Sequence, residues 1–89
     1  MSSEIQIRNK SVGRFFKTAR DRAGLTQMML AKELGYTSPQ FVSNWERGLC
    51  SPPFWALAKI VKLTKVPASA VKEVYMASFE KMVDKALKK

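Results

Sequence analysis

The feature that most constrains the fold of this chain is a set of helix-ending residues placed at short intervals. Glycine, which readily takes the positive φ that ends a helix, stands at Gly24, Gly35 and Gly48. Ser51 is followed by two prolines, and a proline lacks the amide hydrogen that a helix interior needs. The segments between these boundaries are therefore short and closely connected.

Within these segments, apolar residues recur every three or four positions, which is the spacing of one helix face. Thr26 and Ser38 are good N-caps, and Pro39 suits the first position of the third helix. Trp45 is expected in the core, and so is Trp55, for which an exposed contact is the alternative. The sequence predicts an all-α fold of five helices, at about residues 10–23, 26–35, 38–48, 54–64 and from 67 almost to the C-terminus.

The charge balance favours an anionic partner. Lys and Arg number 16 against 7 Asp and Glu, a formal net charge of +9. A basic protein attracts nucleic acid through counterion release. The alternatives are that the charge binds anionic membranes or acidic proteins, or that it only keeps the protein soluble.

Residue types that carry catalysis are scarce. The chain has no histidine, its acidic residues are scattered, and no glycine-rich phosphate loop is present. We therefore expect no enzyme activity, no cofactor and no metal site. The one cysteine, Cys50, cannot form an internal disulfide, and no apolar run reaches the length of a membrane span, so we expect a cytoplasmic protein.

The second and third predicted helices are joined by only Gly35, Tyr36 and Thr37. So short a link with a glycine makes two helices cross steeply, as in a helix-turn-helix, whose second helix enters the major groove of DNA. The outer face of the third helix carries Gln40, Ser43 and Asn44. These side chains both donate and accept hydrogen bonds, as contact with base edges requires, although a solvated face is the alternative.

Two linked motifs carry a resemblance to a known family. Residues 26–35, TQMMLAKELG, fit the pattern T-Q-x-x-L-A-x-x-x-G, and residues 42–48, VSNWERG, fit I-S-x-W-E-x-G. Residues 12–66 thus resemble the Cro and phage-repressor helix-turn-helix domain, a lambda-repressor-like fold of five helices.

The resemblance implies roles for individual residues. Arg20 would pair with Glu46 in a structural ion pair that joins the first helix to the third. The implied base contacts are Pro39, Gln40, Ser43 and Asn44. The implied contacts to the DNA backbone are Gln27, Thr37, Ser38, Arg47, Ser51 and, in the N-terminal arm, Arg8 and Lys10.

The chain also departs from the family pattern. One extra residue near Tyr36 and Thr37 leaves the start of the third helix open by one residue. Met28 and Met29 stand where acidic or polar residues are usual, and the loop after Gly48 lacks the usual basic residues.

We divide the chain into an N-terminal arm (1–10), a helix-turn-helix domain (11–66) and a C-terminal helix (67–89). In the last of these, apolar positions approximate a heptad seam, which favours dimerisation over packing on the domain's own core. The seam comprises Val71, Tyr75, Ser78 or Phe79, Met82 and Ala86.

The function predicted from these observations is sequence-specific binding of double-stranded DNA by a homodimeric transcriptional regulator, with repression as the simplest mechanism. The alternative is a protein-interaction module, such as an antitoxin or an anti-repressor, that keeps the helix-turn-helix. An apolar patch of Met28, Met29, Leu49 and Phe54 would then bind a protein partner. No RNA-module motif supports RNA binding.

Overall fold

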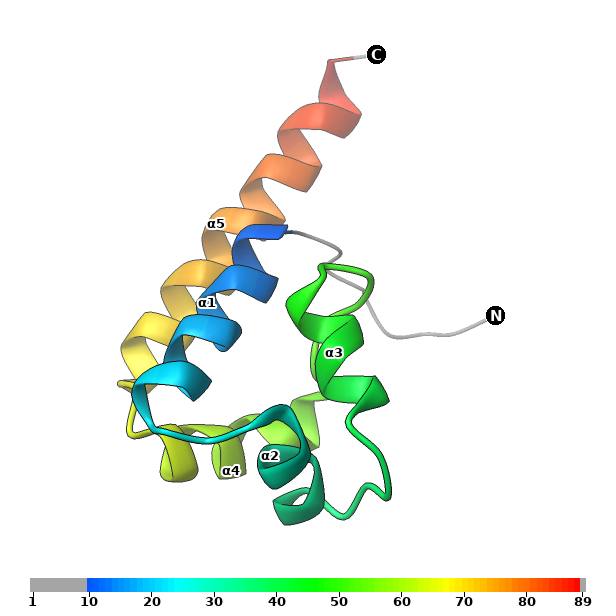
Figure 1. Ribbon diagram of the computed structural model, residues 1–89. Helices are drawn as coiled ribbons and strands as arrows, with labels where there is room; N and C mark the ends of the chain where they lie inside the picture. The colour runs from blue at the N-terminus through cyan, green and yellow to red at the C-terminus, as the bar shows by residue number, and fades with distance from the viewer. Residues whose placement is uncertain (1–9, 89) are drawn as a thin grey trace.

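The computed structural model describes residues 10–88, and in that part of the chain the structure is all-α (Figure 1). The helices are α1 (Lys10–Arg22), α2 (Gln27–Glu33), α3 (Gln40–Glu46), α4 (Phe54–Thr64) and α5 (Ala68–Leu87). This confirms the predicted fold class, with five helices and a long C-terminal one. Lys10, which we placed in the N-terminal arm, is the first residue of α1.

Glycines with positive φ follow both α2 and α3. Gly35 has φ +90° and follows α2, while Gly48, with φ +79°, follows α3. An L side chain rarely adopts this conformation, so glycine is required for a short turn at both places. At Gly35 the chain can therefore change direction within a few residues, which lets α2 pack against α3.

The third helix begins one residue later than the sequence indicated. Pro39 is the cap rather than the first helical residue, because its carbonyl accepts the first helical hydrogen bond, from the amide of Ser43 at 2.9 Å. The Ser38 hydroxyl still accepts from the amide of Gln40 at 3.4 Å. Pro39 therefore belongs to the link between α2 and α3 and not to the helix.

The core lies where α1, α2, α3 and α4 meet, with the first half of α5 closing it. Its buried apolar residues are Val12, Phe16, Leu30, Ala31, Leu34, Val42, Trp45, Ala56, Ile60 and Val71. Trp55 was wrongly predicted to be in the core, since it is 62% exposed. Ala56 and Ile60, one turn apart, form the inner face of α4, and Trp55 therefore lies to one side of it.

Helix α5 is longer than the core it covers. Val71 and Ser78 are buried on the domain, whereas Phe79, Val83 and Leu87 are exposed. The second half of the helix, orange to red in Figure 1, projects away from the other four helices. Among the described residues, no helix is long and apolar enough to cross a membrane.

Candidate nucleic-acid interface

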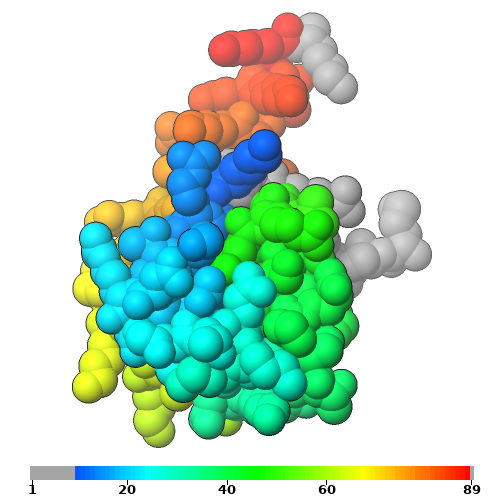
Figure 2. Space-filling model, in the orientation of Figure 1, coloured from blue at the N-terminus to red at the C-terminus, as the bar shows by residue number. Residues whose placement is uncertain are grey.

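The third helix has an inner side fixed to the domain and an outer side open to solvent. Val42 and Trp45 are buried, while Gln40 and Arg47 are exposed. In the space-filling view α3 forms part of the outer surface, in green, beside α2 (Figure 2). The helix therefore presents a supported polar face, as a helix that enters a groove must.

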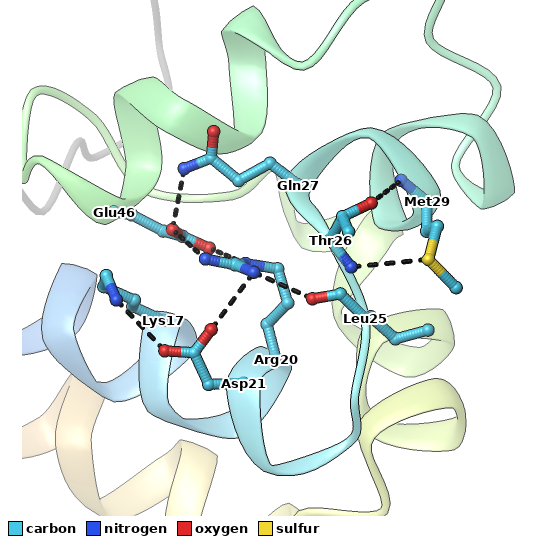
Figure 3. Close-up of polar contacts among 8 residues, drawn as sticks. All are labelled: Lys17, Arg20, Asp21, Leu25, Thr26, Gln27, Met29 and Glu46. Atoms are coloured by element: carbon cyan, nitrogen blue, oxygen red, sulfur yellow. Dashed lines mark hydrogen bonds and ion pairs between the residues drawn. The ribbon is translucent and has the colours of Figure 1, made fainter.

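A buried ion pair joins α1 to the end of α3 (Figure 3). Arg20 Nε donates to Glu46 Oε2 at 2.6 Å, and Arg20 Nη2 donates to Glu46 Oε1 at 2.9 Å. The two side chains are only 8% and 4% exposed. The guanidinium also donates from Nη1 to the carbonyl of Leu25 at 2.8 Å and pairs with Asp21 at 3.2 Å. The pair predicted between Arg20 and Glu46 is therefore present, with its charges and hydrogen bonds satisfied.

The hydrogen bonds to Glu46 raise the pKa of Arg20 above its ordinary value, because they stabilise the charged guanidinium more than burial opposes it. Conversely, the pKa of Asp21 lies below its ordinary value because Lys17 donates to its carboxylate at 3.0 Å. The Asp21 carboxylate is thus held in its charged, accepting form beside Lys17 and Arg20.

Gln27 belongs to the same cluster. Its Nε2 donates to Glu46 Oε1 at 2.9 Å, so the half-buried side chain links α2 to α3 (Figure 3). The sequence indicated a phosphate contact for this residue. In the structure, the side-chain nitrogen of Gln27 already donates one hydrogen bond to Glu46. Only its second N–H and the backbone amides at the start of α2 are left to contact a phosphate.

A close approach between α1 and α3 was missed from the sequence. A Cβ atom added to Gly13 would lie 2.6 Å from the carbonyl oxygens of Trp45 and Glu46. Only glycine lets the two helix backbones approach so closely. Together with the Arg20–Glu46 pair, this contact fixes the C-terminal end of α3 against α1.

The unusual Met29 has a structural role. The Thr26 hydroxyl accepts from the amide of Met29 at 3.0 Å, and the Met29 sulfur accepts from the amide of Thr26 at 3.5 Å. This is a capping box in which a thioether replaces the usual carboxylate or amide. The departure from the family pattern therefore still caps α2.

The four residues expected to contact bases lie along the start and outer side of α3. Pro39 and Gln40 are exposed, and Ser43 and Asn44 are half-buried. Gln40 Nε2 donates to Asn44 Oδ1 at 2.9 Å, and Arg47 Nη2 donates to the same oxygen at 2.6 Å. These bonds were not predicted from the sequence. We call the three residues Gln40, Asn44 and Arg47 the outer row.

The residues expected to contact the DNA backbone are more dispersed. Thr37, Ser38 and Arg47 are exposed around α3, and Lys10 is exposed at the start of α1. Ser51 is half-buried near the hydroxyl of Tyr75, without the geometry of a hydrogen bond. Arg8 lies outside the described residues.

The longer turn between α2 and α3 is held by aromatic packing. Tyr36 stacks on Phe41, with ring centroids 4.5 Å apart, and meets Trp45 edge-on at 6.0 Å. The exposed Trp55 lies 6.1 Å from Tyr36. The turn between α2 and α3 is therefore anchored to α3 and α4 through Tyr36, which was not predicted from the sequence.

Another part of the surface, between α4 and α5, forms an apolar groove of about 490 Å³. Its lining residues are Phe54, Leu57, Val71, Lys72, Tyr75, Met76 and Phe79. Met29, expected with Phe54 in one apolar patch, is exposed as Phe54 is, and its sulfur also caps α2. Within residues 10–88, no group of three or more Cys, Asp or Glu side chains is placed to hold a metal ion.

Comparison with known proteins agrees with this arrangement. The family model described as a helix-turn-helix domain matches residues 11–74. No curated protein and no solved structure matches the chain.

Proposed function

The chain belongs to the helix-turn-helix domain family, and we propose that it binds double-stranded DNA by placing α3 in the major groove and reading base edges there. The observation that carries this proposal is the contrast between the two sides of α3. Its outer side carries Gln40, Ser43 and Asn44, which hydrogen-bond without net charge, whereas its inner side is fixed to α1. Side chains of this kind distinguish base pairs in the major groove.

Rigid support of α3 favours sequence reading over charge attraction alone. Base contacts discriminate only when the helix holds its donors and acceptors in a fixed register. Glu46 receives hydrogen bonds from α1 and α2, and Gly13 lets the α1 backbone meet that of α3. The recognition helix is thus braced at its C-terminal end from two directions.

Phosphate contacts would supply most of the affinity. The formal net charge of +9 favours binding to any DNA, at a strength that falls with salt. We propose backbone contacts along the rim of α3 and at the start of α1 and α2. These contacts come from Gln27, Thr37, Ser38, Arg47 and Ser51, with Arg8 and Lys10 from the N-terminal segment.

We further propose that the protein binds as a homodimer through α5. The exposed apolar residues Phe79, Met82 and Val83 follow Ser78, the last buried residue of α5. A second copy of α5 would bury them as one helix packs on another. Two recognition helices would then meet major grooves about one helical turn apart, roughly 34 Å, on a palindromic site.

Such a protein would act in the cytoplasm as a transcriptional regulator of the lambda-repressor type. Repression follows most simply, because a dimer bound at a promoter blocks access of polymerase. A second candidate function is favoured by the groove between α4 and α5, whose apolar lining suits a protein partner. An antitoxin or anti-repressor would use that groove and would not depend on Gln40.

The test is selection from random double-stranded DNA with the wild-type protein and with a Gln40→Ala, Asn44→Ala variant. We expect a short palindromic consensus for the wild type and loss of that consensus in the variant. A Lys59→Ala, Lys62→Ala variant, altered on the exposed side of α4, is the control that keeps the consensus. Binding by all three proteins without a consensus, and weakening with salt, would contradict sequence reading.

A further inference from the structure

The outer row limits what Asn44 can offer to a base. Its Oδ1 accepts from Gln40 at 2.9 Å and from Arg47 at 2.6 Å. An amide oxygen has two lone pairs, so both are occupied, and only the two N–H donors of Asn44 remain. An asparagine that pairs with adenine must accept through this oxygen and donate through its nitrogen. The arrangement therefore disfavours adenine opposite Asn44.

The same bonds place the guanidinium of Arg47. This side chain follows Asn44 by three positions, and its contact brings the guanidinium back along the outer face of α3. Arginine has five N–H donors, and the bond to Asn44 uses one of them. Within residues 10–88, no carboxylate forms an ion pair with Arg47, whereas Arg20 has two such partners. In this part of the chain, no carboxylate therefore balances the charge of Arg47, and most of its N–H donors remain available.

Arg47 and Asn44 together present donors and no free acceptor. Among the bases, guanine displays two neighbouring acceptors in the major groove, O6 and N7, and a guanidinium matches them with two parallel N–H groups. Adenine and cytosine each present an amino donor there, which these side chains cannot accept. Gln40 retains its Oε1 as an acceptor one turn earlier, so the outer row changes from accepting to donating along α3.

From this pattern we propose that Arg47 is a specificity-determining residue that selects guanine, with Asn44 as the residue that positions it. This assignment rests on the proposed DNA binding, and for Arg47 it replaces the contact to the DNA backbone that was expected from the sequence and proposed above. Each half-site then contains a guanine whose O6 and N7 face the C-terminal end of α3.

The experiment begins with the selected consensus duplex and a duplex in which 7-deazaguanine, which lacks the N7 acceptor, replaces the assigned guanine. We expect this replacement to weaken wild-type binding by roughly 5-fold, the low end of the range for a complete bidentate base contact, because the O6 acceptor remains. Arg47→Ala should bind both duplexes equally, and Asn44→Ala should reduce the difference between them. Arg47→Lys keeps the charge but not the planar fork, so it should discriminate between the two duplexes less than the wild type does.

Arg22→Ala is the matched control, because Arg22 is an exposed arginine at the end of α1. It should retain the full discrimination. If Arg47→Ala weakens binding to every sequence equally while the consensus persists, and Arg47→Lys restores affinity, then Arg47 contacts a phosphate and the assignment is wrong. A wild type that selects no consensus overturns the proposed function and, with it, this assignment.

Discussion

Glu46 and Arg47 are neighbours in sequence, yet they belong to two hydrogen-bond networks with opposite properties. Glu46 lies on the inner side of α3, where Arg20 and Gln27 use its oxygens in a buried cluster. Arg47 lies in the outer row, where one bond to Asn44 leaves its other donors facing solvent. The comparison shows that polar side chains hold α3 in place on its inner side, whereas on its outer side they leave hydrogen-bond donors unused.

The largest expected effect comes from breaking the inner network, by which we mean Glu46 and its partners Arg20 and Gln27. Glu46→Ala leaves Arg20 buried and without its main partner, which typically costs about 3–5 kcal/mol of unfolding free energy. Urea denaturation followed by circular dichroism measures this loss. Arg47→Ala, one residue away, is the control and should change stability by no more than about 0.5 kcal/mol. Equal losses for both variants would remove the distinction between the two sides of α3.

The next effect concerns the backbone contact beside the inner network. Gly13→Ala places a methyl group against the carbonyls of Trp45 and Glu46, and overpacking of this kind costs about 1–3 kcal/mol. Elsewhere in a helix, replacing glycine by alanine raises the unfolding free energy by roughly 0.5–1 kcal/mol. The direction of the change therefore tells whether α3 lies against Gly13. The unfolding free energy of Gly13→Ala should therefore fall, while Thr18→Ala on the exposed side of α1 stays near wild type. A more stable Gly13→Ala protein would show that α1 and α3 lie further apart.

Tyr75 provides a buried polar group without the partners that the inner network has. Its hydroxyl is buried and has no hydrogen-bond partner among the described residues, and burial raises its pKa from 10.0 to about 12. The folded state therefore retains the phenolic proton at a pH where the unfolded state releases it. This contribution to stability is complete below pH 10 and is lost as pH rises through about 12.

Tyr75→Phe should keep its stability at neutral pH or gain up to about 1 kcal/mol, since no hydrogen bond is lost. Between pH 10 and 12, unfolding free energies should fall less steeply for this variant than for the wild type. A clear loss at neutral pH would mean that the hydroxyl has a partner.

The smallest effect on stability is expected in the outer row. Gln40→Ala removes one exposed hydrogen bond and should change the unfolding free energy by at most about 0.5 kcal/mol. Its DNA consensus should nevertheless relax, because the acceptor at the start of α3 is gone. A measured loss of several kcal/mol would place Gln40 with the structural residues.

The sequence predicted the features that local chemistry controls. Glycines at positive φ, the Thr26 cap and the three- and four-residue spacing of apolar positions defined the helices to within one or two residues. The Arg20–Glu46 pair followed from the resemblance to a family rather than from spacing, since its partners lie 26 residues apart.

Features that depend on the distance between helices were missed. The need for glycine at position 13 arises from the approach of α3, and the exposure of Trp55 depends on which side of α4 meets the core. The outer row was missed for another reason. A spacing of three or four residues permits hydrogen bonds between side chains on a helix, but the side-chain rotamers decide whether these bonds form. A glycine inside an otherwise regular helix was the available signal for the first of these.

The most direct test of the central claim is to map amide chemical shifts of the protein by NMR as a short double-stranded DNA is added at low salt. We predict changes along α3 and at the start of α2, with the amides of the second half of α5 unchanged by DNA contact. Shifts confined to the groove between α4 and α5, with α3 unaffected, would contradict DNA binding through the outer side of α3.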